Sequence, residues 1–146
     1  MKRLFVVAAL FAIALSMSFA QGTSSVTYAD HDKVAAAIAN GGQLANGPDF
    51  AISMAKRSGP GQVEVHDKET DTFYVLEGQA TFVTGGTMIG GKVSAPNQQR
   101  GTDIKGGETH RLGKGDVIAI PAGVPHWFKE VTQLPFTYYV VKVIKP

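Results

Sequence analysis

A β-strand that runs into a rigid corner beside a histidine is the feature that most constrains the fold of this chain. It occupies residues 115–130. Three β-branched residues at positions 117–120 favour a strand. Pro121 and Gly123 then restrict and redirect the backbone, and His126 follows at once. This pattern predicts one imidazole held at a fixed place on a β-sheet.

The remainder of the chain repeats short strand-like segments separated by glycine. This pattern is typical of an all-β barrel or sandwich. Glu77 and Gly78 indicate a turn between two of the segments. The expected strands cover residues 50–56, 62–66, 72–76, 79–84, 108–112 and 136–144.

One short helix is expected before the strands. Asp30 is a suitable N-cap, the alanine-rich stretch 33–39 favours helix, and the sequence from Asn40 to Gly42 should end it. Further along, residues 85–107 are rich in glycine and amides and predict a long loop or an irregular hairpin. Such a segment is either a solvated insertion or a flap over one mouth of a barrel.

The N-terminus has the pattern of a secretory signal peptide. Lys2 and Arg3 precede an apolar run at residues 4–15, and Ser18 to Ala20 form a small-x-small cleavage site. We expect a signal peptide over residues 1–20 and one domain over residues 21–146 in the periplasm or outside the cell. A membrane anchor is the alternative, but the run is short for a bilayer, so no membrane association is expected after cleavage.

Charge and cysteine content exclude several classes of function. Without Lys2 and Arg3, the fourteen basic residues become twelve and balance the twelve acidic residues. The mature chain therefore has no basic surface that would indicate nucleic-acid binding. The chain has no cysteine, which excludes disulfides, thiolate ligands and cysteine nucleophiles.

The corner resembles the second sequence motif of the cupin family. That motif reads Gly-x5-Pro-x-Gly-x2-His-x3-Asn, and this chain supplies Gly115, Pro121, Gly123 and His126, with Glu130 in place of the asparagine. The first cupin motif has two histidines one residue apart, then a glutamate and a glycine. It is matched in part by Glu64, His66, Asp71 and Gly78. Glu64 replaces the first histidine and Asp71 replaces the glutamate. The motif core spans residues 58–130.

The resemblance implies a double-stranded β-helix, or jelly-roll barrel, following the short N-terminal helix. It also implies a divalent metal site inside the barrel, with His66, His126, Asp71 and Glu64 as ligands. Nitrogen and oxygen donors of this kind suit Fe, Mn, Zn, Ni or Cu. Phe73 and Phe128 lie two residues beyond expected ligands, so they should line the same pocket.

The two carboxylates leave several roles open. Glu64 could be a metal ligand, a catalytic acid or base whose pKa is raised by burial, or the mark of a site that has lost its metal. Asp71 could bind the metal or orient a histidine. No lysine is evident beside the motif on the inner face. Burying both carboxylates would then be costly, and a divalent cation would remove that cost.

Two functions are consistent with this pattern. One is an exported metal-dependent enzyme, of oxygenase (dioxygenase) or isomerase type, acting on a small organic molecule. The alternative is a non-catalytic module that binds a small ligand or a metal, because this fold serves many functions. The apolar segment 136–144 and Trp127 further suggest a homodimer.

Overall fold

The structure is a computed structural model that describes residues 25–146. The predicted signal peptide over residues 1–20 lies outside the described residues. No helix within residues 25–146 is long and apolar enough to cross a membrane.

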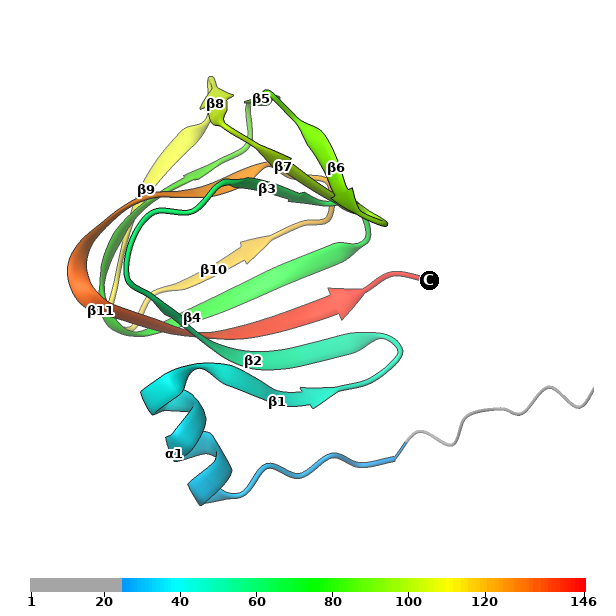
Figure 1. The fold of residues 1–146 in the computed structure, drawn as a ribbon, viewed down its shortest axis with the longest axis vertical. Coiled ribbons are helices and arrows are strands. Elements are labelled where there is room, and N and C mark those ends of the chain that lie inside the picture. Colours follow the sequence, from blue (N-terminus) through cyan, green and yellow to red (C-terminus); the bar gives the residue numbers. More distant parts are fainter. Residues whose placement is uncertain (1–24) are drawn as a thin grey trace, which may run out of the picture.

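One helix and eleven strands make up the described chain (Figure 1). In chain order they are α1 (His31–Asn40), β1 (Gly42–Asn46), β2 (Phe50–Arg57), β3 (Val63–His66), β4 (Glu69–Thr84), β5 (Thr87–Ile89), β6 (Lys92–Ala95), β7 (Gln98–Gly101), β8 (Asp103–Lys105), β9 (Glu108–Gly113), β10 (Val117–Ile120) and β11 (His126–Ile144).

Two long strands, β4 and β11, organise the barrel. They pair antiparallel from Thr84 opposite His126 to Glu69 opposite Ile144, with several shifts of register along the way. The first half of β4 and the second half of β11 extend to β10 on one side and to β2 and β1 on the other. The remaining halves extend to β9 and to β3, β7 and β6. This arrangement confirms the predicted all-β, double-stranded β-helix (jelly-roll) fold (Figure 1).

The predicted turn at Gly78 is wrong, because the expected strands 72–76 and 79–84 form the single strand β4. Gly78 is the point where this strand bends, and its φ angle is 83°. A Cβ atom there would lie 2.6 Å from the carbonyl oxygen of Gln133 on β11, so only glycine fits. Similarly, the expected strand 136–144 is the second half of β11.

The predicted N-terminal helix is confirmed as α1. The Asp30 carboxylate accepts a hydrogen bond from the Lys33 backbone N–H at 2.8 Å, and Gly41 caps the other end with a φ angle of 75°. The buried face of the helix contributes Ala37, which packs with Leu44 and Met54 of β1 and β2. The helix therefore covers the outside of the sheet and leaves the barrel interior to other residues (Figure 1).

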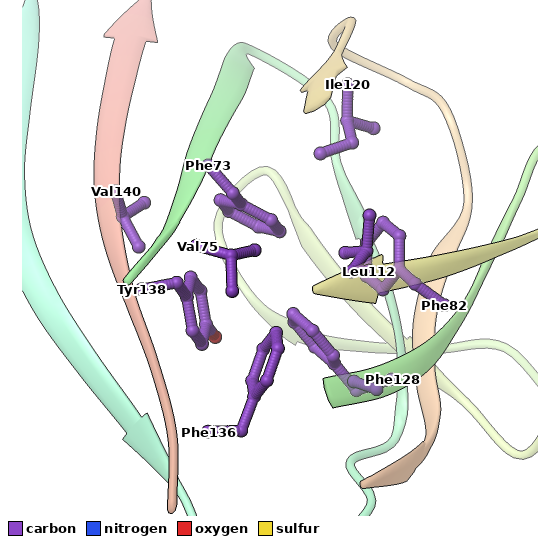
Figure 2. Packing of buried hydrophobic residues seen from close by; sticks show 10 residues of the cluster. Phe73, Val75, Phe82, Leu112, Ile120, Phe128, Phe136, Tyr138 and Val140 are labelled. Atoms are coloured by element: carbon purple, nitrogen blue, oxygen red, sulfur yellow. The ribbon is translucent and has the colours of Figure 1, made fainter. Parts of the chain in front are cut away.

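Aromatic side chains fill much of the barrel interior. The rings of Phe82 and Phe128 lie 4.5 Å apart, and those of Phe73 and Tyr138 lie 5.0 Å apart, measured between centroids. Figure 2 shows how these rings and Phe136 meet from different strands. Edge-to-face and tilted contacts of this kind stabilise a core beyond simple burial.

The glycine-rich segment 85–107 forms short paired strands, as the predicted irregular hairpin would, and most of its residues are exposed. Strands β5 and β8 pair with each other, and β6 forms a hairpin with β7. Strand β7 continues the main sheet by pairing with β3, which places Gln98 opposite His66. The segment therefore supplies part of the wall around the residues described next.

Candidate metal centre

The two sequence motifs bring four ionisable side chains together inside the barrel. Glu64 and His66 come from β3, Asp71 from the start of β4, and His126 from the first position of β11. His66 Nε2 lies 3.3 Å from Glu64 Oε2 and 3.5 Å from Asp71 Oδ2. His126 Nε2 lies 3.8 Å and 3.9 Å from the same two oxygens. The structure thus gathers all four residues that the sequence predicts as ligands.

The proline–glycine corner positions both histidines. Gly123 has a φ angle of 82°, and its backbone N–H donates a hydrogen bond to the carbonyl oxygen of His66 at 2.8 Å. The carbonyl oxygen of Val124 lies 3.0 Å from His126 Nδ1. A carbonyl can only accept, so Nδ1 carries the proton and the free lone pair of His126 is on Nε2.

A chain of hydrogen bonds sets the tautomer of His66. Gln98 Nε2 donates to the Glu69 carboxylate at 2.8 Å, so the amide oxygen of Gln98 must face the other way, toward His66 Nδ1. His66 Nδ1 forms a short hydrogen bond with that oxygen, and it is therefore the donor. Lys142 Nζ donates a hydrogen bond to the other carboxylate oxygen of Glu69, Oε2, at 2.7 Å. In the neutral ring of His66, as in that of His126, the lone pair is therefore on Nε2.

Both Nε2 atoms are buried and have no hydrogen-bond partner among the described residues. The two imidazole rings lie 5.0 Å apart, and their side chains are almost fully buried. A buried polar atom without a partner is costly, and it is rare in native proteins. Two such lone pairs beside two carboxylate oxygens form a donor set that fits a divalent cation.

The charges of the site are set by its surroundings. Burial acts to raise the pKa of Glu64, but the adjacent His66 and the positive charge of Arg100 outweigh it and lower that pKa to about 2. The hypothesis of a raised Glu64 pKa is therefore wrong, and Glu64 is a carboxylate at neutral pH. Burial lowers the pKa of His126, which keeps its ring neutral. Burial also acts to lower the pKa of His66, but Glu64 and Asp71 outweigh it and raise that pKa.

The expectation that the carboxylates lack cationic partners is wrong. Lys142 Nζ contacts both oxygens of Asp71, at 2.9 Å and 3.0 Å, and Arg100 Nη2 lies 3.6 Å from Glu64 Oε1. Lys142 neutralises Asp71 across the β4–β11 pair, where the two residues are register partners. The need to neutralise buried carboxylates is therefore no argument for a metal, and the argument rests on the two Nε2 atoms instead.

A cavity of about 190 Å³ opens beside this centre. Glu64, Asp71 and His126 line it, whereas His66 is not one of its lining residues. The side chains that share the cavity wall with these three are Phe73, Phe128, Tyr138, Val140, Lys142, Arg57, Gln62, Ser53 and Ala55. Phe73 and Phe128 thus line the cavity, as predicted from their position two residues after the expected ligands.

The sequence analysis missed several residues of the site, among them Lys142, Gln98, Arg100 and Arg57. A signal existed for Lys142, because it continues the inward alternation of Phe136, Tyr138 and Val140 along one face of β11. Gln98 and Arg57 gave no comparable signal, since their roles depend on which strands lie next to theirs.

Comparison with known proteins assigns the class. The family model described as Cupin matches residues 49–143, which is well over half of the chain. The chain belongs to the cupin family. No curated protein sequence matches it significantly.

Solved structures show the same fold at low sequence identity. BH2720 from Bacillus halodurans superposes with a TM-score of 0.58 at 16% identity, over 86% of each chain. The Cnp3 cupin domain from Schizosaccharomyces pombe gives a TM-score of 0.53 at 16% identity, over 72% of this chain and 60% of that one. TT1209 from Thermus thermophilus gives 0.51 at 19% identity, over 73% of this chain and 85% of that one.

Proposed function

We propose that this protein is a metal-binding cupin whose barrel holds one divalent cation beside a small-molecule cavity. His66, His126 and Glu64 would hold the cation, with Asp71 as a fourth donor. The observation that carries the proposal is the pair of buried His Nε2 atoms that have no hydrogen-bond partner in the described chain and lie 3.3 to 3.9 Å from two carboxylate oxygens. Iron, manganese, zinc, nickel and copper all accept such nitrogen and oxygen donors.

The proposed activity is a reaction of oxygenase or isomerase type on a small organic molecule. A bound metal would act there as a Lewis acid or as a docking point for oxygen. The chain itself contributes fixed histidine tautomers, the negative charge of Glu64 and a cavity lined by both polar and aromatic side chains. We further propose that the protein is exported and works as a homodimer.

A second candidate is a binding module without turnover. The ion pair of Lys142 with Asp71 favours it, because this carboxylate is already neutralised without any metal. Elemental analysis of protein purified from its native compartment without a histidine tag separates the two. A stoichiometric redox-active metal supports the enzyme. Protein that stays metal-free after incubation with each of the five metals would contradict the metal site itself.

Replacing Glu64 with Gln should weaken metal binding while the barrel stays folded. The change keeps the shape of the side chain and removes a charge 3.3 Å from His66 Nε2. If Glu64 is a ligand, we expect metal affinity to fall by about ten- to a hundredfold or more, judging from the effect of residues outside the ligand set. Isothermal titration calorimetry with Zn²⁺ or Mn²⁺ measures this. Unchanged affinity together with lost turnover would instead make Glu64 a catalytic group.

Replacing Gln98 with Leu should also weaken metal binding, although Gln98 is not a ligand. The change removes the acceptor that holds the proton on His66 Nδ1. Loss of such an orienting partner costs about ten- to a hundredfold in metal affinity. Gln99→Leu is the matched control, because Gln99 is the next residue of β7 and bonds Asp67 instead. Equal affinities of the two variants would show that Gln98 does not orient His66.

A further inference from the structure

Arg57 has no acidic partner among residues 25–146. It is the last residue of β2 and lines the cavity beside the candidate metal centre. No carboxylate of the described chain lies within ion-pair distance of its guanidinium, whereas Lys142 and Arg100 each have an acidic partner. A cation without an acidic partner on the wall of a cavity can bind an anion.

The neighbours of Arg57 hold its guanidinium in place without neutralising it. Its Cζ lies 4.2 Å from the centre of the Phe128 ring, and its Nε donates a hydrogen bond to Tyr138 Oη at 3.0 Å. Burial raises the pKa of Tyr138, so its hydroxyl keeps its proton. That hydroxyl accepts from Arg57 and still has its own O–H to donate. The Nη groups of Arg57 and the Tyr138 O–H are therefore donors available to one ligand.

The spacing along β11 limits the length of that ligand. Phe128 lies two residues beyond His126, so the two side chains stand about 7 Å apart on the same face. The guanidinium over Phe128 is thus separated from the candidate metal centre by roughly one ring or a short carbon chain. The rings of Phe73, Phe128 and Tyr138 line the same cavity, and Figure 2 shows these rings grouped together.

The volume of the cavity also limits the size of the ligand. At about 190 Å³ it is slightly larger than the ~150 Å³ cavity known to hold one benzene molecule. The planar fork of a guanidinium matches a carboxylate through two parallel hydrogen bonds.

We propose that the cavity binds a small monocarboxylate, with one ring or a short chain, whose carboxylate lies against Arg57 and Tyr138. The apolar body of the ligand contacts Phe73 and Phe128, and its far end points toward His126 and Glu64. This inference rests on the proposed small-molecule site and assigns its substrate class. It does not require that a metal be bound.

Benzoate and its neutral counterpart benzamide test the proposal by calorimetry on the metal-free and metal-loaded protein. Benzoate should bind the wild type more tightly than benzamide does. Arg57→Gln should weaken benzoate by roughly ten- to a hundredfold and leave benzamide nearly unchanged, since only the charged ligand loses its partner. Arg57→Lys keeps the positive charge but loses the planar guanidinium. Its affinity for benzoate should lie between those of the wild type and Arg57→Gln. Thermal melts establish that each variant is folded.

Arg111→Gln is the control, because Arg111 is an exposed arginine of β9 outside the cavity. It should bind benzoate as the wild type does. The proposal is overturned if benzoate binds no better than benzamide, if neither probe nor butanoate binds, or if Arg57→Gln and Arg111→Gln behave alike. Zn²⁺ affinity is measured in parallel on the same variants. Benzoate binding without metal binding would contradict only the metal proposal, and the reverse would contradict only this one.

Discussion

Replacing His126 with Ala is expected to abolish metal binding while the barrel remains folded. The change removes one of the two buried lone pairs that define the site. Alanine supplies no donor atom, and the Pro121–Gly123 corner fixes the backbone before this position. Loss of a ligand should exceed the effect of losing an orienting neighbour, so affinity should fall by more than about a hundredfold.

Calorimetry with Zn²⁺ and elemental analysis of the purified variant measure this loss. His110→Ala is the matched control, because His110 lies on β9, bonds Thr84 at 2.8 Å and is not among the residues that meet at the centre. Circular dichroism should show the same β signal for both variants. A His126→Ala protein that retains metal at the affinity of the wild type would contradict the proposed site.

Replacing Lys142 with Met should destabilise the metal-free protein strongly. Asp71 is only 2% exposed, and Lys142 is its ion-pair partner at 2.9 Å. Removing one member of a buried pair leaves an uncompensated charge, which costs about 3 kcal/mol or more in the free energy of unfolding. Glu69 would lose the same partner, but it is less buried than Asp71. Urea unfolding of metal-free protein measures the change.

Metal should rescue the Lys142→Met variant more than it stabilises the wild type. A divalent cation would neutralise Asp71 in place of the ammonium group, and Asp71 would be released from Lys142 to act as a ligand. The rise in Tm on adding Zn²⁺ should therefore be larger in the variant. Lys114→Met, which alters an exposed lysine between β9 and β10, should match the wild type. Absence of rescue would mean that Asp71 lies outside the ligand set.

Local sequence patterns predicted most of the architecture. Strand β2 was expected at 50–56 and runs over Phe50–Arg57, and the helix capped by Asp30 begins at His31. These elements are predictable because alternation, capping and β-branching act over a few residues. The single strand β4 was not predicted. The sequence does not distinguish a glycine at a bend within a strand from a glycine at a turn between strands. At Gly78 the requirement for glycine comes from the close approach of β11 carbonyl groups, which only the tertiary structure shows.

The positions of the candidate ligands within their own strands could also be predicted from local sequence. His66 and Glu64 are two residues apart on one strand, and the Pro121–Gly123 corner fixes the backbone just before His126. Their convergence was inferred from the resemblance to a known motif pair. The observed distances of 3.3 to 3.9 Å between donor atoms agree with that inference.

By itself, then, the sequence determined the all-β class and the helix, since these depend on patterns within short segments. The jelly-roll barrel and the meeting of the four side chains followed from the resemblance to the cupin motifs. The tertiary structure alone decided their chemical state. Lys142 meets Asp71 across 71 positions of sequence, and Gln98 meets His66 across 32. Arg57 reaches Tyr138 across 81. These contacts follow from the register of strands that are distant in sequence, and no local pattern encodes that register.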